Sequence, residues 1–176
     1  MSENIERIFA QAFAEDYNTH LVGGAEEPLY EPGESNCAHK IHYRHDYFAS
    51  ALHEVAHWCV AGSQRRLQTD YGYWYAEDGR SEEQQRLFEQ VEIKPQALEW
   101  IFSKASARPF RVSADNLAQN LGPSTSFKQA IYRACQNYCA QGLPPRPARF
   151  VAELAKHYRV EAPLSAEHYS LEALDA

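Results

Sequence analysis

The motif His53-Glu54-Val55-Ala56-His57 constrains this chain more than any other feature. It lies within residues 48–60, where the spacing of apolar residues predicts a helix. Two histidines four positions apart on a helix point the same way, one turn apart, so both imidazoles can reach one ion. The same pattern occurs in zinc peptidases, where the glutamate is the general base. The sequence therefore predicts a metal centre on this helix.

An alternative is that His53 and His57 are ordinary, partly buried residues beside an apolar stripe that includes Leu52 and Ala56. We favour the metal centre because the complete motif lies on a strongly helical, apolar segment. Glu54 lies beside the two histidines and is the candidate catalytic residue, able to contact a metal-bound water or a substrate.

A catalytic metal usually has a third protein ligand and an open position. The six residues after His57 contain no histidine, but the helical segment that begins near Ser81 offers carboxylates. Glu89 and Glu92 are three positions apart on one face of it. We favour Glu92, which has apolar neighbours on both sides, and take Glu89 as the second choice. The alternative for such acidic residues is a solvated helix face.

This ligand set leaves the chemistry open. Two histidines and one carboxylate form the facial triad of non-haem Fe²⁺ oxygenases. The same set also suits a zinc metallopeptidase with Glu54 as the general base. A purely structural metal would normally have Cys or His as its fourth ligand, and Cys59 is badly placed for that role because it faces another side of the helix.

The rest of the chain predicts an α+β fold, mainly helical with a small β-sheet and the metal site on a central helix, in a single domain over residues 1–176. Val22-Gly23-Gly24 is interpreted as a turn, and residues 71–75 as a strand or an aromatic loop. Short strands are expected at 19–22 and 40–44, and helices at 5–14, 48–60, 81–92 (disturbed near Pro95 and resuming through 102), 113–121, 126–139 and 147–158.

Charge and composition narrow the classes of function. The net charge of -7 argues against general nucleic-acid binding, which needs a basic surface. The first residues lack the pattern of a secretory signal, and no apolar run approaches the roughly 18 residues of a membrane span. The four cysteines form no C-x-x-C pair. We therefore expect a cytoplasmic protein without a membrane partner.

Three residues are candidates for substrate binding: Tyr73, Asp70 and Gln96. Tyr73 belongs to the aromatic segment 71–75, which could form the wall of a pocket for a long side chain. Asp70 could attract an amine. Gln96 follows Glu92 by one helical turn.

Several stretches together resemble the bacterial elongation factor P hydroxylase family. They are residues 53–59, 65–66, 70–75, 78–80, 88–98, 109–110, 112–113, 115–117 and 144–150. The resemblance extends from about Phe13 to Tyr158, and the combination of motifs is specific.

The resemblance implies a metal-dependent oxygenase, with iron as the expected metal and dioxygen as co-substrate. It would hydroxylate the modified lysine of translation elongation factor P after a β-lysyl group has been attached. The family pattern carries onto His53, His57 and a downstream glutamate as metal ligands. No H-x-D pair is present and the ligands lie on a helix, so a requirement for 2-oxoglutarate is not supported.

Overall fold

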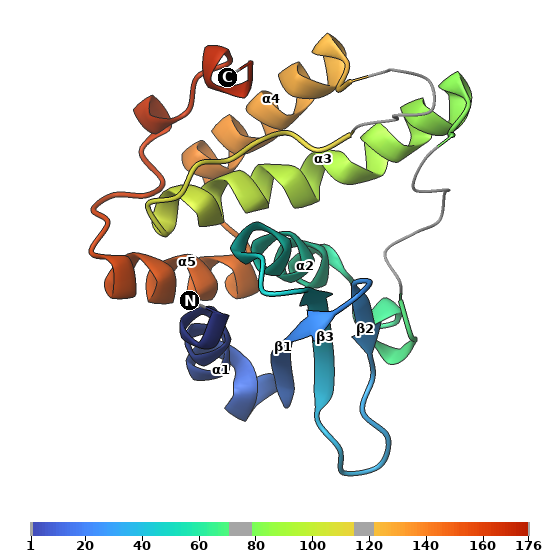
Figure 1. The fold of residues 1–176 in the computed structure, drawn as a ribbon. Helices are drawn as coiled ribbons and strands as arrows, with labels where there is room; N and C mark the ends of the chain where they lie inside the picture. The colour runs from blue at the N-terminus through green and yellow to red at the C-terminus, as the bar shows by residue number, and fades with distance from the viewer. Residues whose placement is uncertain (1, 71–78, 115–121, 176) are drawn as a thin grey trace.

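The computed structural model describes residues 2–70, 79–114 and 122–175. Within these ranges, helices form most of the structure and three strands form one sheet (Figure 1). The elements are α1 (Ser2–Tyr17), β1 (Thr19–Ala25), β2 (Leu29–Glu31), β3 (His39–Arg44), α2 (Phe48–Val60), α3 (Glu82–Ala105), α4 (Thr125–Gln141) and α5 (Pro145–Tyr158), with short 3-10 turns at Arg65–Leu67, Ala166–His168 and Glu172–Leu174. The predicted fold class, mainly helical with a small sheet, is confirmed.

The sheet has the strand order β1-β3-β2. β3 pairs parallel to β1 and antiparallel to β2. Successive side chains of β3 point to opposite faces of the sheet, and those of Ile41 and Tyr43 are buried. α1 packs against β1, and α2 packs against β3 and α3, so that α2 lies between the sheet and the long helix (Figure 1).

The glycine pair after Val22 does not form a turn, so that prediction was wrong. β1 continues through it to Ala25, and its pairing with β3 shifts register between Val22 and Ala25. A β-carbon at Gly23 would lie 2.7 Å from the hydroxyl oxygen of Tyr43. Gly23 is therefore needed for close approach to Tyr43 within the sheet, at an irregular point of the strand.

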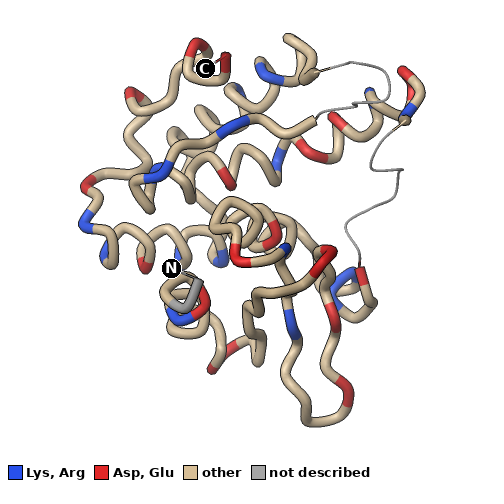
Figure 2. The backbone as a smooth tube through the Cα atoms, viewed as in Figure 1, with Lys and Arg blue, Asp and Glu red and all other residues tan. Residues whose placement is uncertain are grey.

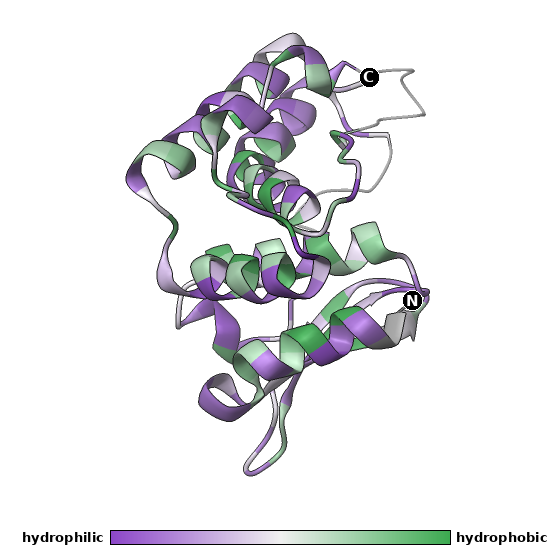
Figure 3. Ribbon diagram, turned by 90° about the vertical axis from the view of Figure 1, so that its left-hand side faces the viewer, coloured by the Kyte–Doolittle hydropathy of each residue, from purple (hydrophilic) through white to green (hydrophobic). Residues whose placement is uncertain are grey.

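α2 has two different faces. Its apolar residues, such as Leu52 and Val55, are buried in the common core, whereas His53 and His57 are only half-buried. Figure 3 shows that hydrophobic and hydrophilic residues occur together on each helix, as amphipathic packing requires.

The C-terminal end of α2 is held by Arg146 on α5. Its guanidinium donates hydrogen bonds to the carbonyls of Trp58 and Ala61, at 2.6 and 2.7 Å. These bonds satisfy carbonyls at the end of α2 and fix its position.

α3 is one continuous helix, so the predicted disturbance near Pro95 was wrong. Ser81 and Gln84 form a reciprocal capping box at its start, as the sequence indicated. Pro95 is buried within the helix. Proline removes one backbone hydrogen bond, but α3 packs against α2, α4 and α5, and this burial offsets the loss.

Two predicted segments, 113–121 and 71–75, lie wholly or mostly outside the described residues. Ser113 and Ala114 are not helical, and the rest of the expected helix at 113–121 falls outside the described residues, as do residues 71–75. Lys, Arg, Asp and Glu are spread over all layers of the molecule (Figure 2). None of the helices in the described ranges has the length and apolar character that crossing a membrane requires.

Candidate metal centre

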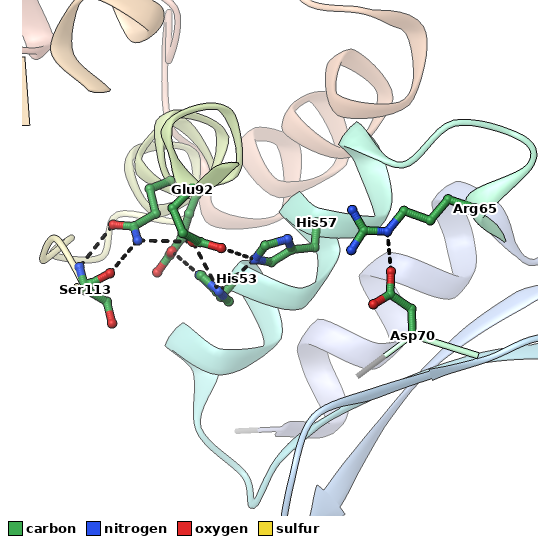
Figure 4. A network of polar contacts seen from close by, with 8 residues as sticks. His53, His57, Arg65, Asp70, Glu92 and Ser113 are labelled. Carbon is green, nitrogen blue, oxygen red and sulfur yellow. Dashed lines mark hydrogen bonds and ion pairs between the residues drawn. The ribbon is translucent and has the colours of Figure 1, made fainter. Parts of the chain in front are cut away.

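Three side chains from α2 and α3 converge where the two helices pack. The Nε2 atoms of His53 and His57 lie 3.0 Å apart. The Glu92 carboxylate reaches both rings, 3.1 Å from Nε2 of His57 and 3.8 Å from Nε2 of His53 (Figure 4). Each of the three residues offers one ligand atom within 4.8 Å of the others. Imidazole nitrogen and carboxylate oxygen bind divalent metals of several kinds, so this group could hold one.

The buried carboxylate and the two imidazoles shift one another's acidity. Burial alone would raise the pKa of Glu92, but the adjacent His57 and His53 lower it to about 2. Burial alone would lower the pKa of His53, but the carboxylates of Glu99 and Glu92 raise it to about 10. Without metal, these contacts favour a proton on His53, and an ion must displace that proton to bind.

A pH dependence follows from these shifts. The His53 contribution to stability is complete below its ordinary pKa of 6.5 and is lost as pH rises through about 10. The Glu92 contribution is present above 4.5 and is lost as pH falls through about 2. We expect the melting temperature of the metal-free protein to fall between pH 6.5 and 10, and bound Zn²⁺ to reverse much of that fall. Calorimetry with and without the ion measures this, and a flat metal-free profile over that range would contradict it.

The two candidate glutamates have different surroundings. Glu92 is 3 % exposed and faces the histidines. Glu89 is also buried, but its carboxylate accepts hydrogen bonds from the backbone N–H and the hydroxyl of Ser124, at 3.0 and 2.6 Å. Ser124 is the N-cap of α4. Glu89 therefore anchors the start of α4 and is not a solvated residue.

Gln96 is fully buried beside Glu92. Its amide nitrogen donates to the Glu92 carboxylate at 3.2 Å and to the Ser113 carbonyl at 2.6 Å, and its oxygen accepts from the Ser113 N–H at 3.0 Å. Gln96 thus supports Glu92 and holds the segment after α3. A direct contact of Gln96 with substrate stays a prediction.

Glu99 was missed by the sequence reasoning. Its carboxylate lies 2.8 Å from Nδ1 of His53, on the side of the ring away from Glu92. The sequence shows the spacing alone, and the structure buries the whole row of polar residues on α3, whose spacings alternate between four and three: Gln85, Glu89, Glu92, Gln96, Glu99 and Ser103. Such a row on one helix face is costly to bury unless its members have partners. Continuing the spacing one turn beyond Gln96 reaches Glu99.

Asp70 lies near the centre without touching its ligands. Its carboxylate accepts a hydrogen bond from Nε of Arg65 (Figure 4). Its backbone forms a bridge with Tyr30. Asp70, Glu54 and His57 line the same cavity of about 30 Å³. Burial raises the pKa of Glu54. Tyr73 falls outside the described residues.

A second cavity lies on the other side of the centre, next to His53. It has a volume of about 440 Å³ and is lined by His53, Glu99, Phe110 and Arg111 among others. The two cavities flank the histidine pair, so the centre combines three convergent candidate ligands with access from solvent. That combination suits catalysis better than a closed structural site.

Comparison with known proteins identifies the family of the chain. The sequence model of the family "Elongation factor P hydroxylase" matches residues 8–169. A protein of Haemophilus influenzae named "Elongation factor P lysine hydroxylase" is 48% identical to this chain over 160 residues, covering 90% of each sequence. A match of this length, from α1 to the C-terminal turns, includes every element of the metal centre. The chain belongs to the elongation factor P hydroxylase family.

Proposed function

We propose that this protein hydroxylates a lysine of translation elongation factor P, using a metal ion held by His53, His57 and Glu92. The observation that carries the proposal is the convergence of these three side chains, in a chain that is 48% identical to a protein named for that activity. The enzyme is then an oxidoreductase of the monooxygenase type. It works where its protein substrate is, in the cytoplasm.

The proposed reaction favours iron as the metal. His53, His57 and Glu92 could hold Fe²⁺ or Zn²⁺, but the transfer of an oxygen atom from dioxygen needs a redox-active ion. Bound Fe²⁺ would supply the activation of dioxygen that hydroxylation of an unactivated carbon requires.

One carboxylate beside His57 is suited to a cationic substrate chain. Asp70 is paired with Arg65, and Arg66 lines the same cavity, so Glu54 is the carboxylate there that could attract an ammonium group of a lysyl-lysine side chain. We propose that Asp70 and Tyr73 contact the lysylated form of the substrate and that Glu54 lies next to the reacting carbon. Hydroxylation adds one oxygen atom to carbon and sends the other to water, with two electrons from a reductant. No 2-oxoglutarate is included in this proposal.

Intact-mass spectrometry tests the proposed function. Iron-loaded protein is incubated with lysylated elongation factor P, air and ascorbate, and the substrate is then weighed. We expect a gain of one oxygen atom with the wild type and no gain with His53→Ala. An unchanged mass with protein that retains its iron would refute the proposed substrate.

The same experiment addresses the zinc peptidase alternative. A peptidase with Glu54 as the general base would cleave a peptide bond with bound Zn²⁺ and without dioxygen. Fragments of elongation factor P formed in air-free buffer would favour that activity over hydroxylation.

A further inference from the structure

The imidazole of His53 lies between two carboxylates. Its Nε2 atom faces Glu92 and His57, and its Nδ1 atom lies 2.8 Å from Oε2 of Glu99. Glu99 is 7 % exposed and comes from the same buried face of α3 as Glu92, two turns further along the helix. The ring is therefore held on both sides by side chains of one rigid helix.

This contact determines which ring nitrogen carries the proton. A neutral imidazole has one N–H and one nitrogen with a free electron pair. A carboxylate only accepts hydrogen bonds, so the short contact with Glu99 requires the N–H at Nδ1. The electron pair of Nε2 then points to the position shared with His57 and Glu92, where an ion would bind.

The contact with Glu99 is not duplicated elsewhere in the centre. Within the described ranges, no other side chain is hydrogen-bonded or ion-paired to the Glu99 carboxylate, although Arg111 lines the same cavity. Glu92 has Gln96 as its support. On the Nδ1 side, the orientation of His53 therefore depends on the Glu99 carboxylate.

We propose that Glu99 is a positioning residue of the metal centre, which holds His53 as the Nδ1-protonated tautomer and so sets the affinity for the metal. This inference rests on the proposed function only in so far as His53 is a metal ligand. Glu99 lies outside the group of three convergent ligand atoms, on the opposite side of the His53 ring. Outer carboxylates of this kind orient the ring and increase its basicity as a ligand.

Two measurements test the role of Glu99 without using the hydroxylation assay. Co²⁺ serves as the probe, with affinity measured by competition against a chelator and coordination followed by its visible spectrum. Glu99→Ala is expected to weaken Co²⁺ binding by roughly 10- to 100-fold and to change the spectrum. Glu99→Gln, whose amide oxygen still accepts from Nδ1–H, is expected to lose less affinity. The matched control is Glu6→Gln, which alters a carboxylate that accepts from Gly23 and Tyr43, away from the centre. It should bind Co²⁺ as the wild type does.

The second measurement uses nuclear magnetic resonance of nitrogen-labelled wild-type protein loaded with Zn²⁺, and so does not depend on a variant that folds. We expect His53 to bind the ion through Nε2 with its proton on Nδ1. Wild-type affinity and an unchanged spectrum in folded Glu99→Ala, or metal bound through Nδ1 in the wild type, would overturn the proposal. Failure to hydroxylate elongation factor P with these metal-binding results intact would refute the proposed function alone.

Discussion

Replacing Glu92 with glutamine is expected to remove tight metal binding and, with it, hydroxylation of elongation factor P, whereas Glu89→Gln keeps both. Glu92 supplies the negative charge among the three converging candidate ligands, 3.1 Å from His57. A neutral amide is a much weaker ligand for a hard divalent ion. The loss of affinity should exceed the roughly 10- to 100-fold effect of losing an outer-shell partner. Glu89→Gln disturbs only the contacts with Ser124 at the start of α4.

Metal content by elemental analysis after dialysis, together with the intact mass of the substrate, measures both variants. Glu89→Gln is the matched control, because it changes a buried carboxylate on the same helix face, one turn away. If Glu92→Gln retained the metal and Glu89→Gln lost it, the third ligand would be Glu89 and not Glu92.

Gln96→Leu is expected to weaken both folding and metal binding. Leucine has a similar size, but it leaves the Ser113 N–H and carbonyl and one oxygen of Glu92 without their partner. A buried polar group that loses its partner costs about 1–3 kcal/mol. Ser113 is exposed, so water can replace some of the hydrogen bonds that its backbone loses. We expect a decrease of about 2 kcal/mol in the free energy of unfolding and a decrease of roughly tenfold in metal affinity.

Urea denaturation of the metal-free protein and chelator competition measure these two effects separately. Gln90→Leu, on the exposed side of the same helix, is the control for adding an apolar side chain to α3. If Gln96→Leu bound metal as tightly as Gln90→Leu does, the contact between Gln96 and Glu92 would have no role in holding the ligand.

The sequence predicted α2 with its bounds because the signal is local. Apolar residues repeat at helical spacing, and the histidine pair shares the half-buried face. The parallel pairing of β1 with β3 is different, because it joins strands that are separated in the chain by β2, and the pattern within either strand does not indicate its partner. The same holds at Gly23, which looks like a turn in the sequence but is required by the distant hydroxyl of Tyr43.

The residues of the metal centre also differ in this respect, because some have a local signal in the sequence and others are brought together only by packing. The motif on α2 indicated His53 and His57 as candidate ligands, because their spacing alone places them together. For the third ligand, sequence could offer both Glu89 and Glu92, since both lie on one helix face. Their roles differ through Ser124, which is 35 residues from Glu89 in the chain. Glu99 lies 46 residues from its partner His53, so its contact with that ring needed the packing of α2 on α3.

The source of the inserted oxygen atom distinguishes an oxygenase from an enzyme that takes the oxygen from water. Lysylated elongation factor P is treated with iron-loaded enzyme and reductant under heavy-isotope dioxygen in ordinary water, and in parallel under ordinary dioxygen. If the His53, His57 and Glu92 centre is that of an oxygenase, the product formed under the heavy gas will be heavier by the isotope difference of one oxygen atom. Products of equal mass under both gases would contradict the account, because the new oxygen would then come from water.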